Sequence, residues 1–327
     1  MIGLRDVEAA RERIHSFIQQ TPLWSSTKLS EKTEIPVYLK LEHLQTTGSF
    51  KLRGATNAIL NLSVAQKKAG VVGVSTGNHG RGLAFAARQA DVRCVICMSR
   101  LVPQNKINGI KAQGAEIRIV GNSQDEAQVE AEKLAAAGMT MLPPFDHPHI
   151  IAGQGTLALE ILEQVPDLET VIVPVSGGGL ISGISLALKT LRSNVRVIGV
   201  SMERGAAMIE SQKARKPILV EELPTLADSL GGGIGLDNQY TFQIVRDCVD
   251  ELVKVTETDI AEAIRFAYWE ERQVIEGSGS VGIAAVISER VNLSGPTVLL
   301  LSGGNIDMSL HKQVIDGINV DVTTSTS

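Results

Sequence analysis

The stretch Val-Ile-Val-Pro-Val-Ser-Gly-Gly-Gly-Leu at residues 171–180 decides the fold of this chain. Residues 171–175 are apolar and rich in β-branched side chains, which predicts a buried strand. Three consecutive glycines follow, and residues 180–191 then have the length and apolar character of a helix. This strand–turn–helix arrangement exposes backbone N–H groups at the positive end of the helix, which suits a phosphate group. A tight turn without a ligand is the alternative, because glycine also serves plain turns.

The alternation of strand and helix extends in both directions from this stretch. We predict further strands at residues 71–75, 92–98, 116–120, 195–200 and 297–301, and helices at residues 81–90, 123–137, 155–164 and 259–275. Such alternation predicts an α/β fold in which parallel, doubly wound sheets carry helices on both faces. Because the proline-rich stretch 142–148 separates two sets of these units, we expect two α/β domains with a cleft between them.

Composition narrows the possible functions. The chain has 327 residues, which favours two lobes over a single core. A net charge of −5 and an aromatic content of 3% argue against a nucleic-acid-binding protein, which usually has a basic patch with aromatic side chains. No apolar run approaches the roughly 20 residues that cross a bilayer, and the charged N-terminus lacks the apolar core of an export signal. We therefore expect a cytoplasmic protein without membrane segments.

The three cysteines are too few for a disulfide framework. Cys94 and Cys97 form a C-x-x-C within a predicted strand, where residues three apart point to opposite faces. There is no second C-x-x-C and no histidine nearby, so we interpret them as buried core thiols and not as a metal or redox site.

Three further segments are rich in glycine and polar residues, namely 47–54, 75–80 and 301–307. Together with residues 176–180 they make four segments, of which three directly follow predicted strands. Because ligands of open α/β sheets bind outside the carboxyl ends of strands, we expect these loops to meet at one crevice. The polar groups of Ser75, Thr76, Asn78 and His79 would suit a substrate carboxylate, with helix capping as the alternative.

Lys51 lies between Phe50 and Leu52 in the first of these segments. A lysine beside an aromatic residue is often a surface residue whose stem packs on apolar neighbours. A desolvated lysine instead has a lowered pKa and becomes a nucleophile toward carbonyl groups. One such lysine, one phosphate-binding turn and one carboxylate-binding loop together point to a phosphorylated aldehyde cofactor, pyridoxal 5'-phosphate.

The segment Gly277–Gly282 matches G-x-G-x-x-G, the dinucleotide-binding pattern. It follows a predicted helix instead of a strand, and no acidic residue stands about 20 residues further on. We therefore do not interpret it as a dinucleotide site.

The chain resembles the fold-type-II pyridoxal-phosphate enzymes, whose fold is like that of the tryptophan synthase β subunit. Within this family it resembles the branch of serine and threonine dehydratases and serine racemases. The resemblance covers residues 5 to 318 and rests on six segments in the same order: 47–54, 75–80, 151–156, 176–180, 234–236 and 301–307. It implies a cofactor in the cleft between two domains. We place the large domain at residues 1–52 and 148–320, the small domain at residues 53–147, and a disordered tail at residues 321–327.

The resemblance implies roles for individual residues. Lys51 matches the lysine that forms a Schiff base with the cofactor and then acts as the base at Cα. The phosphate loop corresponds to Ser176, Gly177, Gly178, Gly179 and Leu180. Asn78 matches the residue beside the phenolic oxygen of the cofactor, and Ser302 the partner of its pyridine nitrogen. The substrate carboxylate is expected at Ser75, Thr76, Asn78 and His79. A hydroxyl such as that of Ser302 does not hold the pyridine nitrogen protonated, which favours rapid loss of a β-leaving group.

The implied activity is that of a dehydratase (ammonia-lyase) of amino-acid catabolism. Such an enzyme carries out β-elimination on a β-hydroxy amino acid such as threonine or serine, giving a 2-oxo acid and ammonia, and is expected to be a homodimer. Residues 75–82 and 202–208 also resemble the hydroxyectoine-utilisation dehydratases. A dehydratase of the hydroxyectoine pathway or of 3-hydroxyaspartate, and a serine racemase, remain as alternatives.

Three departures from the branch matter. Thr76 stands where the racemases place a catalytic serine, so a hydroxyl is kept but a methyl group crowds the site. Of the divalent-cation ligands seen in the branch, Glu203 and the carbonyl of Ala207 are present, but Ile209 takes the position of the second acid. We therefore leave a divalent cation open. Only 20 residues follow Asp307, so we expect no C-terminal regulatory domain.

Overall fold

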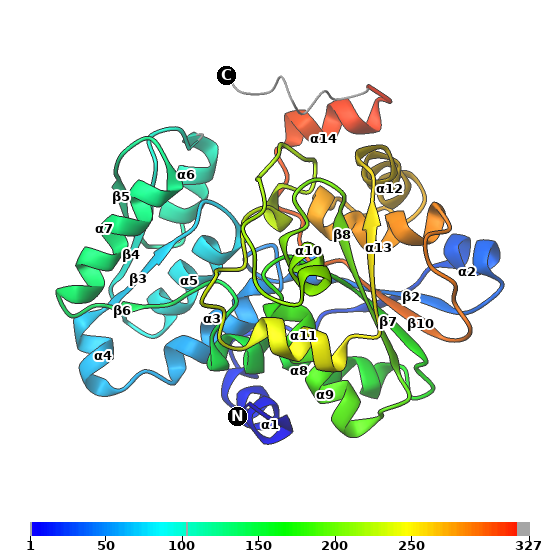
Figure 1. Ribbon diagram of the computed structural model, residues 1–327, viewed down its shortest axis with the longest axis horizontal. Helices are drawn as coiled ribbons and strands as arrows, with labels where there is room; N and C mark the ends of the chain where they lie inside the picture. Colours follow the sequence, from blue (N-terminus) through cyan, green and yellow to red (C-terminus); the bar gives the residue numbers. More distant parts are fainter. Residues whose placement is uncertain (1, 103, 319–327) are drawn as a thin grey trace.

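The computed structural model describes residues 2–102 and 104–318 of the chain. It forms two lobes, each built around its own sheet with helices packed on both faces (Figure 1). The tail predicted at residues 321–327 lies outside the described residues.

The larger sheet has six strands in the order β1-β2-β10-β7-β8-β9. These strands are β1 (Leu23–Ser25), β2 (Val37–Lys40), β10 (Thr297–Leu300), β7 (Thr170–Pro174), β8 (Arg196–Met202) and β9 (Glu251–Val255). All neighbours are parallel except β1, which pairs antiparallel with β2 at the edge. The sequence patterns do not predict β1, β2 or β9. β1 is three residues long and largely exposed, so it carries no apolar run that could reveal it.

The smaller sheet has four parallel strands in the order β5-β4-β3-β6. They are β5 (Glu116–Ile119), β4 (Cys94–Met98), β3 (Val71–Val74) and β6 (Thr140–Met141). The predicted α/β fold with two doubly wound parallel sheets is confirmed, apart from the antiparallel edge strand β1.

Helices connect the strands and cover the faces of both sheets (Figure 1). They are α1 (Leu4–Ile14), α2 (Thr27–Thr33), the 3-10 helix η1 (Glu42–Leu44), α3 (Lys51–Leu60), α4 (Val64–Ala69), α5 (Asn78–Gln89), α6 (Gln104–Lys111), α7 (Gln124–Ala136), α8 (Pro148–Gln164), α9 (Gly179–Leu191), α10 (Ala207–Ala214), η2 (Asp228–Leu230), α11 (Thr241–Cys248), α12 (Glu257–Trp269), α13 (Gly277–Ile287) and α14 (Met308–Ile315). The domain boundary predicted between residues 52 and 53 falls within α3. The second boundary, at 147–148, falls at the start of α8, and this division into domains remains a prediction.

Each sheet has one apolar cluster on each of its faces, because successive strand residues point to opposite sides. In the larger sheet, Ile172 and Leu299 pack with α12 and α13, whereas Val171 and Val298 pack with α8 and α9. Burial on both faces explains why the inner strands read as continuous apolar runs.

The two cysteines of the C-x-x-C motif confirm this alternation. Cys94 packs in the cluster that holds Val71, and Cys97 packs in the cluster on the other face that holds Val72. Burial raises the pKa of the Cys94 thiol to about 12 and that of Cys97 to about 11. Both are core thiols, as predicted.

The helix predicted at residues 259–275 is wrong in its last part. α12 begins at Glu257 and ends at Trp269, and Arg272 has a left-handed φ of 61°. The chain leaves the helix here because residues 270–276 return to the larger sheet, where the N–H of Glu276 donates to the carbonyl oxygen of Gly303 at 3.1 Å. This return brings Glu276 to the ends of the strands.

Candidate active site

The loops that the sequence analysis singled out meet in one cavity of about 220 Å³. It lies at the carboxyl ends of β3, β7 and β10, between the two lobes. The predicted site residues that line it are Lys51, Ser75, Thr76, Asn78, His79, Ser176, Gly177, Gly178, Gly179, Leu180 and Ser302. The structure therefore brings these residues together as expected, while their chemical roles remain predictions.

Lys51 is the first residue of α3 and contributes a half-buried side chain to the cavity. Its Nζ donates a hydrogen bond to the carbonyl oxygen of Pro144 at 2.9 Å and lies 5.3 Å from the centre of the Phe50 ring. Burial lowers the pKa of Lys51 from 10.5 to about 8, and the negative charge of Glu276 opposes this shift only in part. An amine with such a pKa has a substantial neutral fraction near neutral pH, so it can attack a carbonyl carbon.

The glycine turn after β7 leads directly into α9, which begins at Gly179. Gly178 has a φ of +88°, and a Cβ there would lie 2.7 Å from Cε of Met208. A Cβ at Gly179 would lie 2.9 Å from Cα of Phe145. Glycine is thus required at 178 by its backbone conformation and at 179 by the lack of space. The backbone N–H groups of this turn lie at the N-terminus of a 13-residue helix. These features suit an anion such as a phosphate.

The loop after β3 serves in part as a helix cap. Oγ of Ser75 accepts hydrogen bonds from the backbone N–H groups of Gly77 at 3.3 Å and Gly80 at 3.1 Å. Nε2 of His79 lies 3.1 Å from the carbonyl oxygen of Leu142, and burial lowers the pKa of this imidazole to about 3. His79 is therefore neutral at physiological pH and can offer a substrate carboxylate no positive charge.

Glu276 is a candidate functional residue that the sequence analysis missed. It lines the cavity, is 4% exposed, and accepts a hydrogen bond from Nδ2 of Asn78 at 2.7 Å. Its second carboxylate oxygen accepts one from the backbone N–H of Asn305 at 3.1 Å. Burial and the charge of Asp228 raise the pKa of Glu276 to about 7. A lone acid before a glycine-rich helix start was its only sequence signal, and the helix predicted up to residue 275 obscured it.

The glycine-rich segment that follows Glu276 packs against backbone. A Cβ at Gly279 would lie 2.6 Å from the carbonyl oxygen of Gly303, and one at Gly277 would overlap the carbonyl of Leu226. These glycines allow α13 to approach the loop after β10, so close backbone packing accounts for the glycines of this pattern. Ser278 lies between them, and its buried Oγ lines the cavity without a hydrogen-bond partner.

The residues weighed as cation ligands do not belong to this cavity's lining. The side chain of Glu203 is exposed at the end of β8, and Ala207 is buried at the start of α10. Ile209, which stands in the position of the second acid, is buried and apolar. No group of three His, Cys, Asp or Glu side chains in the described ranges could hold a metal ion. We derive no chemical step from a divalent cation.

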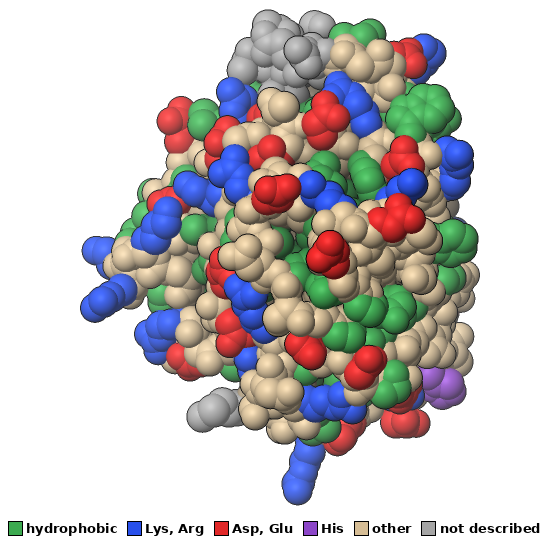
Figure 2. All heavy atoms as spheres, turned by 90° about the vertical axis from the view of Figure 1, so that its right-hand side faces the viewer, with side chains coloured by type: hydrophobic (Ala, Val, Ile, Leu, Met, Phe, Trp, Pro, Cys, Tyr) green, Lys and Arg blue, Asp and Glu red, His purple; other side chains and the backbone are tan. Residues whose placement is uncertain are grey.

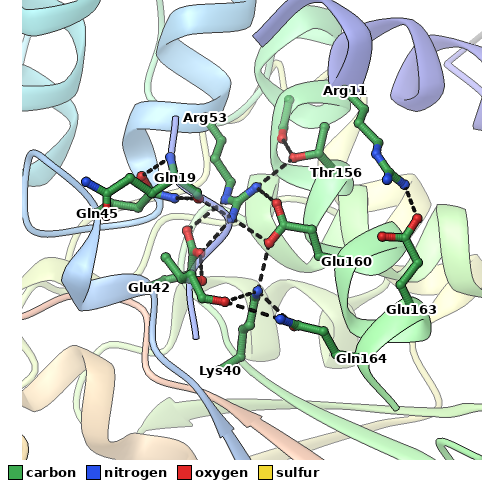
Figure 3. A network of polar contacts seen from close by, with 12 residues as sticks. Arg11, Gln19, Lys40, Glu42, Gln45, Arg53, Thr156, Glu160, Glu163 and Gln164 are labelled. Carbon is green, nitrogen blue, oxygen red and sulfur yellow. Dashed lines mark hydrogen bonds and ion pairs between the residues drawn. The ribbon is translucent and has the colours of Figure 1, made fainter. Parts of the chain in front are cut away.

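A second polar cluster, of buried charged side chains, surrounds Arg53 on the lysine helix α3 (Figure 3). Arg53, two residues after Lys51, pairs with Glu42 at 2.8 Å and with Glu160 at 2.6 Å. Lys40 pairs with the other oxygen of Glu160 at 2.7 Å. The cluster therefore joins α3 to η1, β2 and α8.

Comparisons with known proteins agree with this geometry. The family model described as "Pyridoxal-phosphate dependent enzyme" matches residues 14–304. The chain is 55% identical to a Sinorhizobium fredii protein named "Putative threonine dehydratase", over 97% of this chain and 96% of that one. It is 43% identical to the L-threonine ammonia-lyase of Thermotoga maritima, over 97% and 79% of the two chains. Among solved structures, maize serine racemase superposes with a TM-score of 0.91 at 32% identity, covering 97% of each chain.

Proposed function

Because the chain belongs to the family of pyridoxal-phosphate dependent enzymes, we propose that it is a dehydratase (ammonia-lyase) acting on a β-hydroxy amino acid. Its cofactor is pyridoxal 5'-phosphate. The β-hydroxyl group leaves as water, and uptake of one water then releases ammonia and a 2-oxo acid, so that threonine or serine is converted without an external oxidant or reductant. Lys51 carries this proposal, because its low-pKa amine shares one cavity with an anion-binding helix start.

The described residues fit the cofactor. The N–H groups at the start of α9 offer a site for its phosphate, in a turn where side chains beyond glycine would collide with Met208 or Phe145. The orphaned hydroxyl of Ser278 and the buried Ser302 line the same cavity, where a polar ring edge would find partners. When bound, pyridoxal 5'-phosphate supplies the electron-withdrawing system that weakens the Cα–H bond of the substrate.

Protein groups supply the proton transfers. We propose that Nζ of Lys51 would hold the cofactor and that the free amine of Lys51 would take the proton from the substrate Cα. Burial favours the neutral amine that both steps need. Thr76 lines the same cavity, and its hydroxyl is the candidate for a proton carrier on the other face of the substrate.

The loop after β3 is proposed to receive the substrate carboxylate through N–H and hydroxyl groups. Thr76 and Asn78 line the cavity, while Ser75 and His79 already bond to backbone groups of the protein. The one N–H of the neutral His79 imidazole is used on the carbonyl oxygen of Leu142, so helix-start N–H groups and hydroxyl groups would bind the carboxylate by hydrogen bonds and dipole, with no ion pair.

The cavity also bears on the choice of substrate. Among its described lining residues Lys51 is the sole lysine or arginine; Glu222 adds negative charge, and Asp228 pairs with Lys106 at 2.9 Å. A second carboxylate on the substrate would lack a free cation there, so we expect 3-hydroxyaspartate to react more slowly than threonine or serine. No feature of this cavity favours or opposes the hydroxyectoine-pathway alternative.

A serine racemase is the second candidate, supported by the similarity to maize serine racemase. Thr76 weakens this alternative, because its methyl group crowds the position that serine takes in that branch. Racemisation and elimination are separated by their products.

The proposal extends to a homodimer in the cytoplasm, which the family resemblance supports. No helix in the described ranges is long and apolar enough to span a membrane. Acidic and basic side chains are interspersed on the face seen in Figure 2, with no broad basic patch of the kind that binds nucleic acid. Light scattering after size-exclusion chromatography tests the dimer, and cell fractionation tests the location.

A panel assay of ammonia release tests the proposed function. The substrates are L-threonine, L-serine, 3-hydroxyaspartate and ectoine-derived acids, each with and without magnesium, and chiral analysis follows D-serine. We expect ammonia and a 2-oxo acid in equal amounts from threonine or serine, and none with Lys51→Ala. D-serine without a 2-oxo acid would favour the racemase, and no ammonia from any substrate would contradict a dehydratase.

A further inference from the structure

We propose that Glu276 and Asn305 are positioning residues that fix the amide of Asn78, so that its one remaining N–H points at the phenolic oxygen of the cofactor. This inference rests on the proposed function and adds two residues for which no role was expected. Neither residue belongs to the phosphate loop or to the loop after β3.

The hydrogen bonds around Asn78 form a chain whose directions are fixed. A guanidinium group only donates, and Nη1 of Arg81 donates to Oδ1 of Asn305 at 2.9 Å. Nδ2 of Asn305 therefore carries both donors of that amide. It uses them on the carbonyl oxygen of Thr47 at 2.9 Å and on Oδ1 of Asn78 at 2.6 Å.

The same logic fixes Asn78. Its Oδ1 accepts from Asn305, so its Nδ2 is the end that faces Glu276, to which it donates at 2.7 Å. If the amide of Asn78 were flipped, its Nδ2–H would face the Nδ2–H of Asn305, and its Oδ1 would face the carboxylate of Glu276. Both contacts would be repulsive in a place where Asn78 is 6% and Glu276 4% exposed.

Counting donors leaves one group for a ligand. Nδ2 of Asn78 carries two hydrogens, and one of them is used on Glu276. Because Asn78 lines the cavity, the second N–H is available there as a donor. A donor suits the phenolic oxygen, which accepts and carries negative charge in the bound cofactor. The neighbours of Asn78 thus orient its amide so that it offers the cavity an N–H donor and not an oxygen acceptor.

Glu276 is suited to this task because both of its oxygens are used. One accepts from Asn78 and the other from the backbone N–H of Asn305, so the carboxylate also fixes where the Asn305 loop lies. Gly303 leaves space for it, since a Cβ there would lie 2.6 Å from Oε1 of Glu276. The side chain makes no capping hydrogen bond to α13, so its removal does not uncap that helix.

A double-mutant cycle on the holoenzyme tests this inference. The variants are Glu276→Gln, Asn78→Ala and both together, and the measured quantity is the rate of cofactor release into excess scavenger, followed by visible absorbance. Glutamine has the size of glutamate, but one of its two acceptor oxygens is replaced by an NH₂ group. This NH₂ group would face an N–H of Asn78 or of Asn305, so one hydrogen bond is lost. We expect each single variant to release the cofactor about 10-fold faster, the loss of one well-placed hydrogen bond.

The decisive comparison is the double variant. If Glu276 acts through Asn78, adding Glu276→Gln to Asn78→Ala changes the release rate by no more than about twofold. Circular dichroism in the cofactor's absorption band should change in the same way in both single variants, because it reports how the ring is held. Independent effects that multiply to about 100-fold, or a Glu276→Gln enzyme that behaves as wild type, would overturn the inference.

Controls separate this inference from the proposed function. Glu289→Gln makes the same change of charge beyond the other end of α13, at a side chain that is 81% exposed, and is expected to release the cofactor at the wild-type rate. If Glu276→Gln does not fold, Asn305→Ala removes the other partner of Asn78 and should give the same dependence on Asn78. Failure of borohydride to attach the cofactor to wild-type Lys51 would instead contradict the proposed function itself.

Discussion

Lys40 and Lys51 are two lysines of the same protein interior, and their surroundings differ in kind. All three protons of the Lys40 amine are used, on the carbonyl oxygen of Thr21 at 2.8 Å, on Glu160 at 2.7 Å and on Gln164 at 3.0 Å. Lys51 has one such partner, the carbonyl oxygen of Pro144. Burial lowers the pKa of both amines, but for Lys40 a paired carboxylate opposes the shift.

The difference teaches how burial can serve either structure or chemistry. Around Lys40 and Arg53, two cations face the carboxylates of Glu42 and Glu160, and the cluster holds α3 against its neighbours (Figure 3). At the start of the same helix, Lys51 lies without a paired carboxylate beside an open cavity. A cluster of paired charges therefore anchors the helix that begins with Lys51, the amine that we propose as the reactive one.

The largest expected effect comes from Lys51→Ala. We expect ammonia release to fall by about 10⁴-fold or more, because the variant loses both the attachment point and the base. When both proteins are cofactor-free, the midpoint of urea unfolding should not fall, since no paired charge is lost. A variant that keeps a tenth of the wild-type rate would show that Lys51 is not the reactive amine.

Next in size is Arg53→Met, which leaves two buried carboxylates facing Lys40 alone. We expect the free energy of unfolding to fall by about 3–5 kcal/mol, the usual result of breaking a buried ion pair from one side. Arg93→Met is the matched control, because Arg93 pairs with Glu116 at 2.7 Å on the surface. Its expected cost is below about 1 kcal/mol. Equal losses in the two variants would remove the distinction between the buried cluster and an ordinary surface pair.

The smallest expected effect is a pH dependence of the free energy of unfolding that is caused by the titration of Lys51. In the cofactor-free protein its pKa is about 8, against 10.5 when unfolded, so the unfolded state binds more protons between these values. Stability should therefore rise with pH across pH 8 to 10.5, by about 1–3 kcal/mol more in the wild type than in Lys51→Met. Urea titrations at several pH values measure this difference. Parallel curves for the two proteins would mean that the amine is not desolvated.

The sequence predicted those parts of the fold and site that local patterns encode. Inner strands such as 171–175 are recognisable because burial on both faces leaves a continuous apolar run, and the glycine turn at 176–179 follows one of them directly. Cys94 and Cys97 were placed on opposite faces by the period of a strand alone. Lys51 was found because it stands among short motifs that occur together in one family.

What the sequence did not predict depends on contacts between distant residues. The cluster of Lys40, Arg53 and Glu160 joins three separate segments, and no spacing in the chain marks them as partners. Glu276 was missed because the sequence pattern predicts a helix up to residue 275, whereas the chain turns back after Trp269. The edge strand β1 is too short and too exposed to leave a pattern.

Borohydride reduction tests most directly whether Lys51 is the reactive amine. The holoenzyme is reduced with borohydride, digested and examined by mass spectrometry for peptides that carry a pyridoxyl group. We predict the added mass on the peptide that contains Lys51 and none on the peptide that contains Lys40, whose three protons are all engaged. A cofactor-loaded, folded sample in which Lys51 is unlabelled, or in which Lys40 carries the label, would contradict the account.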